Sequence, residues 1–263
     1  MDALLVLKLV TTPLFVVGAT LVGRRWGPAV SGLLVGLPLT TGPISYFLCS
    51  ERGSAFAVQS AVAGLGGQAA VFAFCLTYAR LARTRSWATA LGTGALAFGA
   101  VAVVVAEARW DLLSAVLFLG VALGFSLRTL SAPQTTDETG PPPWWELPLR
   151  VLITTALVVA ITALANRLGA QRTGILSTFP IYSAIFATFT HTTRGGRASA
   201  QILAGVLLGS VGYGAFFVVV VVFLGAWGPN LTYSVAALAA VAAGYSAFWL
   251  SRHRVALAPT TIG

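Results

Sequence analysis

Long apolar stretches separated by short polar segments make up most of this chain. An α-helix needs about 20 apolar residues to cross a lipid bilayer, and nine stretches approach or exceed that length. They cover residues 3–23, 27–49, 54–79, 87–106, 111–128, 148–166, 173–191, 199–226 and 231–250. The pattern predicts an all-α polytopic membrane protein with about nine transmembrane helices.

The composition agrees with this class of protein. Of the 263 residues, 57% are hydrophobic and only 9% are charged, and the mean hydropathy is +0.87. Ordinary globular domains carry roughly a quarter charged residues. All seven tryptophans fall at the ends of predicted spans, where an amphipathic ring favours the headgroup layer. The first apolar run lacks a basic leading segment, so we expect a retained helix and not a signal peptide.

The net charge of +9 is distributed unevenly between the two predicted sides of the membrane. One side collects eleven arginines, whereas the other has four arginines and the nearby Lys8. The positive-inside rule then places the N-terminus outside and the C-terminus in the cytoplasm. A basic face next to anionic lipid headgroups accounts for the charge, so no nucleic-acid partner is expected.

The chain aligns with itself at one constant offset, without a gap. About a quarter of the positions between residues 8 and 74 are identical to their partners. The matches include polar, glycine and proline residues, which hydrophobic composition alone would not align: Thr12 with Thr154, Pro38 with Pro180, Arg52 with Arg194, Gly53 with Gly195, and Gln59 with Gln201. This pattern indicates an internal duplication.

The predicted topology makes the two copies inverted repeats, because five spans precede the second copy and four spans compose it. Residues 1–129 form the first membrane repeat, 130–147 a proline-rich cytoplasmic linker, and 148–263 the second repeat. Inverted repeats that exchange conformations give alternating access, so we expect a transporter. The alternative is a duplication that only built a stable bundle, since a fold does not establish a function.

Two segments of equal length, "GLLVGLP" at 32–38 and "GILSTFP" at 174–180, occupy equivalent positions in spans two and seven. Proline frees the carbonyl four residues before it, and a freed carbonyl in hydrocarbon needs a partner or a wet cavity. We therefore expect helices 2 and 7 to be broken or kinked near the midplane. The residues expected to bind substrate there are Pro38, Thr40, Thr41, Ser45, Thr178, Pro180, Tyr182 and Ser183. The alternative is a kink that neighbouring hydroxyls merely cap.

Four further polar residues match across the repeat and are candidates for the same site. Gln59 and Gln201 lie in equivalent spans, and a buried amide without partners costs about 1–3 kcal/mol. Thr12 and Thr154 also correspond. An interhelical structural bond for the glutamines and a bond from each threonine to its own helix remain open alternatives.

Cationic residues also occupy matched positions: Lys8, Arg52, Arg150 and Arg194. Cations near the membrane interior would attract an anionic substrate, although long basic side chains near helix ends also reach toward the headgroups. No acidic residue falls deep in a predicted span, and Glu146 is assigned to the linker. The sequence has two histidines without a matching cysteine or acid, and no nucleophile with a base, so we expect no metal, cofactor or enzymatic activity.

The segment "GILSTFPIYSAIFATF" resembles the second span of GlpM-like bacterial inner-membrane proteins, small four-span proteins of obscure role. Each half would correspond to one such chain, with the two fused in opposite orientations. The resemblance covers mainly residues 27–49 and 169–191, and the first copy has Leu37 in place of the phenylalanine before the proline. It implies a bacterial inner-membrane location.

The leading hypothesis is a transporter of a small polar or anionic metabolite, with its site between helices 2 and 7. The alternatives are a translocase for a lipid or lipid-linked precursor and a non-transporting scaffold for envelope synthesis. A closed polar cavity at the two prolines would favour a soluble substrate, a lateral opening would favour a lipid, and a solid apolar core would favour the scaffold. The expected partners are the lipid bilayer and a small-molecule substrate, and a homo-oligomer is left open.

Overall fold

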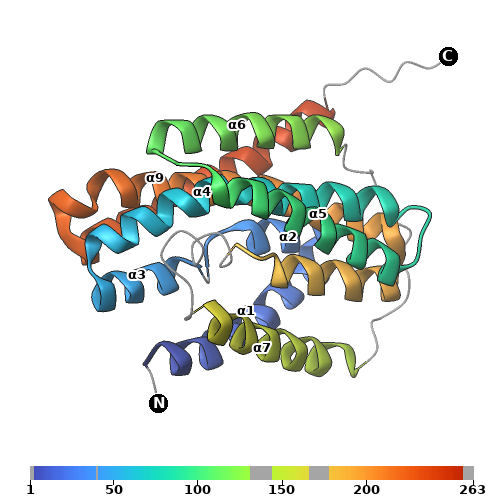
Figure 1. The fold of residues 1–263 in the computed structure, drawn as a ribbon. Coiled ribbons are helices and arrows are strands. Elements are labelled where there is room, and N and C mark those ends of the chain that lie inside the picture. The colour runs from blue at the N-terminus through green and yellow to red at the C-terminus, as the bar shows by residue number, and fades with distance from the viewer. Residues whose placement is uncertain (1–2, 40, 131–143, 166–177, 257–263) are drawn as a thin grey trace.

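The computed structural model describes residues 3–39, 41–130, 144–165 and 178–256, with only the backbone described for residues 3–9, 11, 157–165 and 252–256. These ranges hold helices and no strand (Figure 1). The helices are α1 (Ala3–Trp26), α2 (Pro28–Gly36), α3 (Thr41–Arg52), α4 (Ser54–Leu81), α5 (Trp87–Glu107), α6 (Leu112–Thr129), α7 (Glu146–Ala165) and α9 (Ile181–Ala256).

Five segments of the described chain are long and apolar enough to cross a membrane: Pro28–Arg52, Ser54–Leu81, Trp87–Glu107, Leu112–Thr129 and Ile181–Ser251. The protein is therefore consistent with the membrane class that the hydropathy predicted. The prediction of nine separate spanning helices is not supported. The second predicted span is divided between α2 and α3, and the last two predicted spans, with most of the seventh, lie within α9.

Glycines at positive φ join consecutive helices without a loop. Gly27, Gly53, Gly195 and Gly228 have φ between 71° and 95° and ψ between 165° and 171°, a conformation that is essentially restricted to glycine. At Gly195 the two flanking helices fold against each other, because the hydroxyl of Ser199 donates to the carbonyl of Ala187 at 2.9 Å. Residues 181–194, 196–227 and 229–256 are thus three segments of α9.

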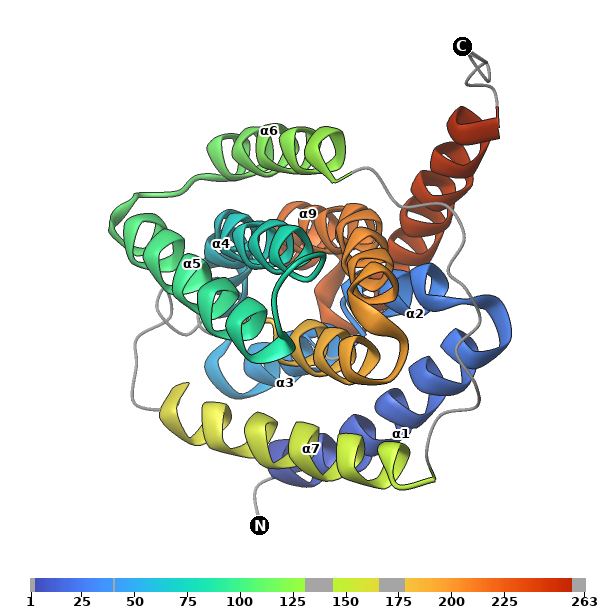
Figure 2. The ribbon, with the colours of Figure 1, turned by 90° about the vertical axis from the view of Figure 1, so that its right-hand side faces the viewer.

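The bundle has α4 and the middle segment of α9 at its centre. Helix α6 lies on one side of this pair, and α1 with α7 lies on the opposite side (Figure 2). Within its most apolar stretch α4 is 78% buried, whereas α6 is 17% buried. Helix α6 therefore presents most of its surface outward, as expected of a helix that faces lipid.

Where α2 crosses the middle segment of α9, glycines of both helices form the contact. A Cβ added at Gly36 would clash with the carbonyl oxygen of Val206, and one added at Gly209 would clash with that of Leu33. Small residues at such spacing allow membrane helices to approach closely. This contact holds the end of α2, and the Pro38 segment that follows it, against α9.

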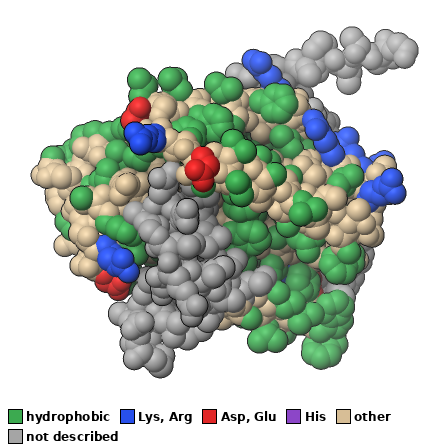
Figure 3. Space-filling model, viewed as in Figure 1, with side chains coloured by type: hydrophobic (Ala, Val, Ile, Leu, Met, Phe, Trp, Pro, Cys, Tyr) green, Lys and Arg blue, Asp and Glu red, His purple; other side chains and the backbone are tan. Residues whose placement is uncertain are grey.

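Basic side chains gather toward one end of the bundle, on the right in Figure 3. Gly196, beside the turn at Gly195, contacts the backbone of Ala82 just after α4, so Arg80 and Arg197 belong to the same end. Helix α7 begins at Glu146, two residues before the predicted start of the second repeat at residue 148.

Candidate functional site

The helix that contains Pro38 is broken, as its sequence predicts. Helix α2 ends at Gly36 and α3 begins at Thr41. The amide of Leu37 donates to the carbonyl of Leu34 at 3.2 Å, so the carbonyl that the proline frees finds a partner in the adjacent turn. The break is therefore a stable local structure with its backbone groups partly satisfied.

The backbone around Pro180 has the same hydrogen bonds. The Pro38 carbonyl accepts from the amide of Gly42 at 2.8 Å, and the Pro180 carbonyl accepts from the amide of Ala184 at 2.8 Å. A second hydrogen bond spans each proline at 2.8 Å. The amide of Leu39 donates to the carbonyl of Leu37, and the amide of Ile181 donates to the carbonyl of Phe179. Helix α9 begins directly after Pro180, while residues 166–177 lie outside the described chain.

A half-open cavity of about 630 Å³ lies at the Pro38 break, between that segment, α3 and the third segment of α9. Pro38, Gly42 and Pro43 form one wall. Aliphatic and aromatic side chains make up most of the remaining lining: Leu37, Leu39, Phe216, Ala237, Ala240 and Val241. A volume of this size accommodates a small organic molecule.

Hydroxyl and amide groups supply the polar part of this cavity. The Tyr46 hydroxyl donates to Oδ1 of Asn230 at 2.7 Å, and both residues line the cavity. Tyr233 also lines it, and its hydroxyl lies 2.8 Å from the hydroxyl of Ser45. At the same break the buried hydroxyl of Thr41 has no hydrogen-bond partner within the described chain.

One side of the cavity opens onto the outer surface of the bundle. Leu39 and Val241, which line it, are 41% and 54% exposed. Ser234 and Ala237, on the same α9 segment as Val241, are exposed as well. Most of these exposed side chains are apolar, so in a membrane the opening would face lipid.

The corresponding space at Pro180 is filled by two aromatic rings. Phe98 packs edge-on against Phe179, with ring centroids 5.1 Å apart and an interplanar angle of 86°. At the offset that pairs Pro38 with Pro180, Ala240 corresponds to Phe98 and Leu37 to Phe179. Ala240 and Leu37 both line the Pro38 cavity, so the cavity lies where smaller side chains replace the two rings.

Several expected site residues lie near the Pro180 break or support their own helix. The Tyr182 hydroxyl donates to Thr12 at 3.2 Å, which connects α9 to α1. Thr178 and Ser183 are buried as well. Thr154 donates to the carbonyl of Arg150 in its own helix at 2.6 Å, the structural alternative that the sequence left open.

The matched glutamines and cations do not all reach the interior. Gln201 is buried, whereas Gln59 is exposed. Arg52 is exposed and lies over the ring of Phe56, with its guanidinium carbon 5.5 Å from the centroid. Thr40 and the side chain of Lys8 lie outside the described residues. Equivalent sequence positions thus have different environments in the two halves.

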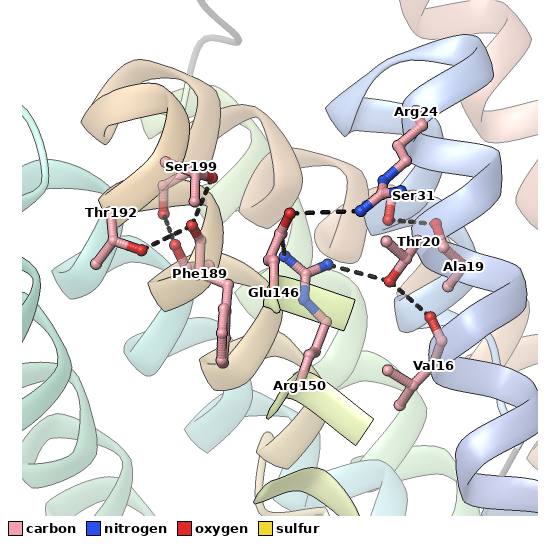
Figure 4. A network of polar contacts seen from close by, with 12 residues as sticks. Val16, Ala19, Thr20, Arg24, Ser31, Glu146, Arg150, Phe189, Thr192 and Ser199 are labelled. Atoms are coloured by element: carbon pink, nitrogen blue, oxygen red, sulfur yellow. Dashed lines mark hydrogen bonds and ion pairs between the residues drawn. The ribbon is translucent and has the colours of Figure 1, made fainter. Parts of the chain in front are cut away.

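Arg150 and Arg194, by contrast, line one small cavity of about 30 Å³ together with Arg24 and Glu146. Glu146 forms an ion pair with Arg150 and a second with Arg24 at 3.6 Å (Figure 4). The assignment of Glu146 to the linker is therefore wrong, because this residue is 4% exposed and begins α7. It was placed outside the bundle because proline-rich sequence precedes it.

Sequence reasoning missed Tyr46, Asn230 and Tyr233 at the first cavity and Arg24 and Glu146 at the second. The Glu146–Arg150 spacing of four residues was a usable signal, since such pairs face each other on a helix. No comparable pattern connects Tyr46 to Asn230, because their contact depends on how α3 packs against α9.

Comparison with known proteins adds no relative: no protein-family model, no curated protein and no solved structure matches this chain.

Proposed function

We propose that this protein is a membrane transporter for a small polar or anionic metabolite, with its substrate site at the breaks beside Pro38 and Pro180. The observation that carries the proposal is the matching set of backbone hydrogen bonds at Pro38 and Pro180, together with the break at Pro38 and its adjoining cavity of about 630 Å³. An interrupted helix leaves backbone groups without partners, and a cavity beside it, inside the membrane. Many transporters bind their solute at such interruptions.

Alternating access by two inverted repeats is part of this proposal. At the constant offset of the repeat, α4 corresponds to the middle segment of α9. Gly196 contacts Ala82 near the end of α4, and a Cβ at Gly64, nearer its start, would lie 2.8 Å from the Tyr213 hydroxyl. The two helices therefore run antiparallel, as equivalent helices of an inverted repeat must.

The orientation follows from the distribution of charge. The end with Arg80, Arg194 and Arg197 faces the cytoplasm of a bacterial inner membrane, in keeping with the positive-inside rule. The Pro38 cavity then lies toward the outer half of the membrane, because its Asn230 adjoins the turn at Gly228, at the other end of the α9 middle segment from Gly195.

The cavity lining favours a substrate with one polar group. Tyr46, Asn230 and Tyr233 offer hydroxyl and amide partners at one part of the cavity, while aliphatic residues line most of the rest. A buried polar group needs a partner, so the substrate would place its polar group at these three residues and an apolar portion against Leu37 and Val241.

A second candidate function is translocation of a lipid or lipid-linked precursor. The lateral opening between Leu39 and Val241 favours it, because an amphiphile could enter from the bilayer with its chain still in lipid. A scaffold without transport activity would need neither the cavity nor its opening.

Two assays on the full chain in proteoliposomes separate these functions. Uptake of labelled polar metabolites and organic anions tests the first, and transfer of a fluorescent phospholipid between leaflets tests the second. Uptake that requires the protein and saturates with solute supports the transporter, and leaflet transfer without uptake supports the lipid translocase. Activity in neither assay across a broad panel would favour the scaffold and count against the proposal.

A further inference from the structure

Three arginines from three helices surround the small cavity at the basic end of the bundle. Arg24 comes from α1, Arg150 from α7 and Arg194 from α9, and Glu146 is the single acid among the described residues that line it. Three positive charges and one negative charge leave an excess of two positive charges. In a site of low dielectric, such an excess is costly until an anion balances it.

Arg150 is held rigidly at the inner wall of this cavity. Its side chain is 4% exposed and its guanidinium carbon lies 4.5 Å and 5.3 Å from the ring centroids of Phe186 and Phe189. One terminal nitrogen pairs with Glu146 and the other donates to the Thr20 hydroxyl at 3.2 Å. Its Nε is buried without a hydrogen-bond partner in the described chain, so this guanidinium retains an unused donor.

The other two arginines are held less firmly than Arg150. Glu146 is shared, since it also pairs with Arg24 at 3.6 Å, and the Arg24 side chain is 34% exposed. Arg194 has no acidic partner among the described residues, and it is half-buried where it lines the cavity. One carboxylate thus serves two arginines while the third has none.

We propose that this cluster binds a tetrahedral oxyanion of the phosphate class. Guanidinium groups present parallel N–H donors that match phosphate oxygens, and three of them converge here. The cavity of about 30 Å³ has room for about two water molecules, so it accepts the oxygens of the anion while anything attached to the phosphorus stays outside. Inorganic phosphate and the headgroup of an anionic phospholipid both meet this requirement.

The competing explanation is an ion-pair network that only fastens α7 to α1. Such a network explains Glu146 with Arg24 and Arg150, but it gives no role to Arg194. The proposed site is also independent of transport, because anion binding is measurable in a protein that moves no solute.

The test is thermal unfolding of the full chain in nanodiscs at constant ionic strength. One series titrates inorganic phosphate into nanodiscs of neutral phosphatidylcholine, and another replaces part of that lipid with phosphatidic acid. Three variants accompany the wild type: Arg194→Gln removes the unpaired charge, Glu146→Gln removes the competing carboxylate, and Arg197→Gln is the control. Arg197 is exposed three residues away and does not line the cavity.

One of the two phosphate sources should stabilise both the wild type and Arg197→Gln. Arg194→Gln should bind the same anion about tenfold more weakly, which is a loss of about 1.4 kcal/mol in binding free energy. Glu146→Gln should bind the anion more tightly even where its unliganded form is less stable, a result that a purely structural network does not produce. Stabilisation by free phosphate identifies a soluble anion, and stabilisation by phosphatidic acid alone identifies a headgroup. Absence of both, or equal binding by Arg194→Gln and wild type, overturns the proposal.

Discussion

Gly53 and Gly195, which the constant offset in the sequence pairs with each other, have nearly the same backbone conformation, with φ 87° and ψ 165° in the first and φ 82° and ψ 169° in the second. Each is the single non-helical residue between two consecutive helical segments. Side chains with a Cβ rarely adopt this region, so a single glycine replaces a loop. The two positions were matched by sequence and have the same local structure.

Replacing Gly195 by alanine should lower the free energy of unfolding by about 1–3 kcal/mol, since alanine must adopt a positive φ. An added Cβ would meet no atom within 4 Å, so the loss reports the backbone conformation alone. Thermal unfolding in detergent measures it. Gly225→Ala is the control, because Gly225 also has free space around it within α9, and there alanine should stabilise by about 0.5–1 kcal/mol. Equal melting temperatures for the two variants would contradict the expectation.

Pro38→Ala and Pro180→Ala should each reduce transport severalfold while leaving insertion and yield unchanged. Alanine restores an amide and removes the ring clash, so the break at Pro38 should tend toward a continuous helix, and α9 should extend toward its N-terminus at Pro180. Initial uptake rates in proteoliposomes provide the measurement. Pro13→Ala serves as the control, since Pro13 lies inside α1 and away from the Pro38 cavity. Unchanged uptake in both break variants would exclude the interrupted helices from the mechanism.

Ala237→Phe should block uptake by filling the Pro38 cavity from its open side. Ala237 lines the cavity and is exposed, so a larger side chain there displaces substrate without overpacking a closed core. Ala242→Phe, five residues along the same segment and exposed outside the cavity lining, should transport normally. The uptake rates of the two variants are compared over a range of substrate concentrations. Equal rates for Ala237→Phe and Ala242→Phe would show that the substrate binds elsewhere.

The matched glutamines should behave differently when each is changed to leucine. Gln201 is 9% exposed, so its variant should weaken substrate binding or stability by about 1–3 kcal/mol through the partners it leaves buried. Gln59 is exposed, and its variant should lie within about 0.5 kcal/mol of wild type. Thermal shift with and without substrate tests both. A large loss for Gln59→Leu would show a role that its exposed position does not explain.

The sequence was sufficient to predict the helical membrane class, the limits of α4, α5 and α6 to within a few residues, and the break at Pro38. These features depend on local chemistry: apolar runs, the missing amide of proline, and polar residues at helix ends. The sequence also pairs positions of its two halves at one constant offset, and the inverted repeat that this pairing suggests stays a prediction.

Whether two corresponding residues have the same surroundings depends on the tertiary structure. Gln59 and Gln201 match in sequence, but only Gln201 faces the interior. Ala240 and Phe98 also correspond, and the difference in side-chain size places the larger cavity at Pro38 and an aromatic contact at Pro180.

Only the fold could bring Arg24, Glu146, Arg150 and Arg194 to one cavity. Their meeting depends on how α1, α7 and α9 pack, and α9 reaches it through a sharp turn at Gly195. Local sequence sets where helices begin and end, whereas contacts between distant helices arise from the shapes of their surfaces, and no short pattern in the sequence encodes those shapes.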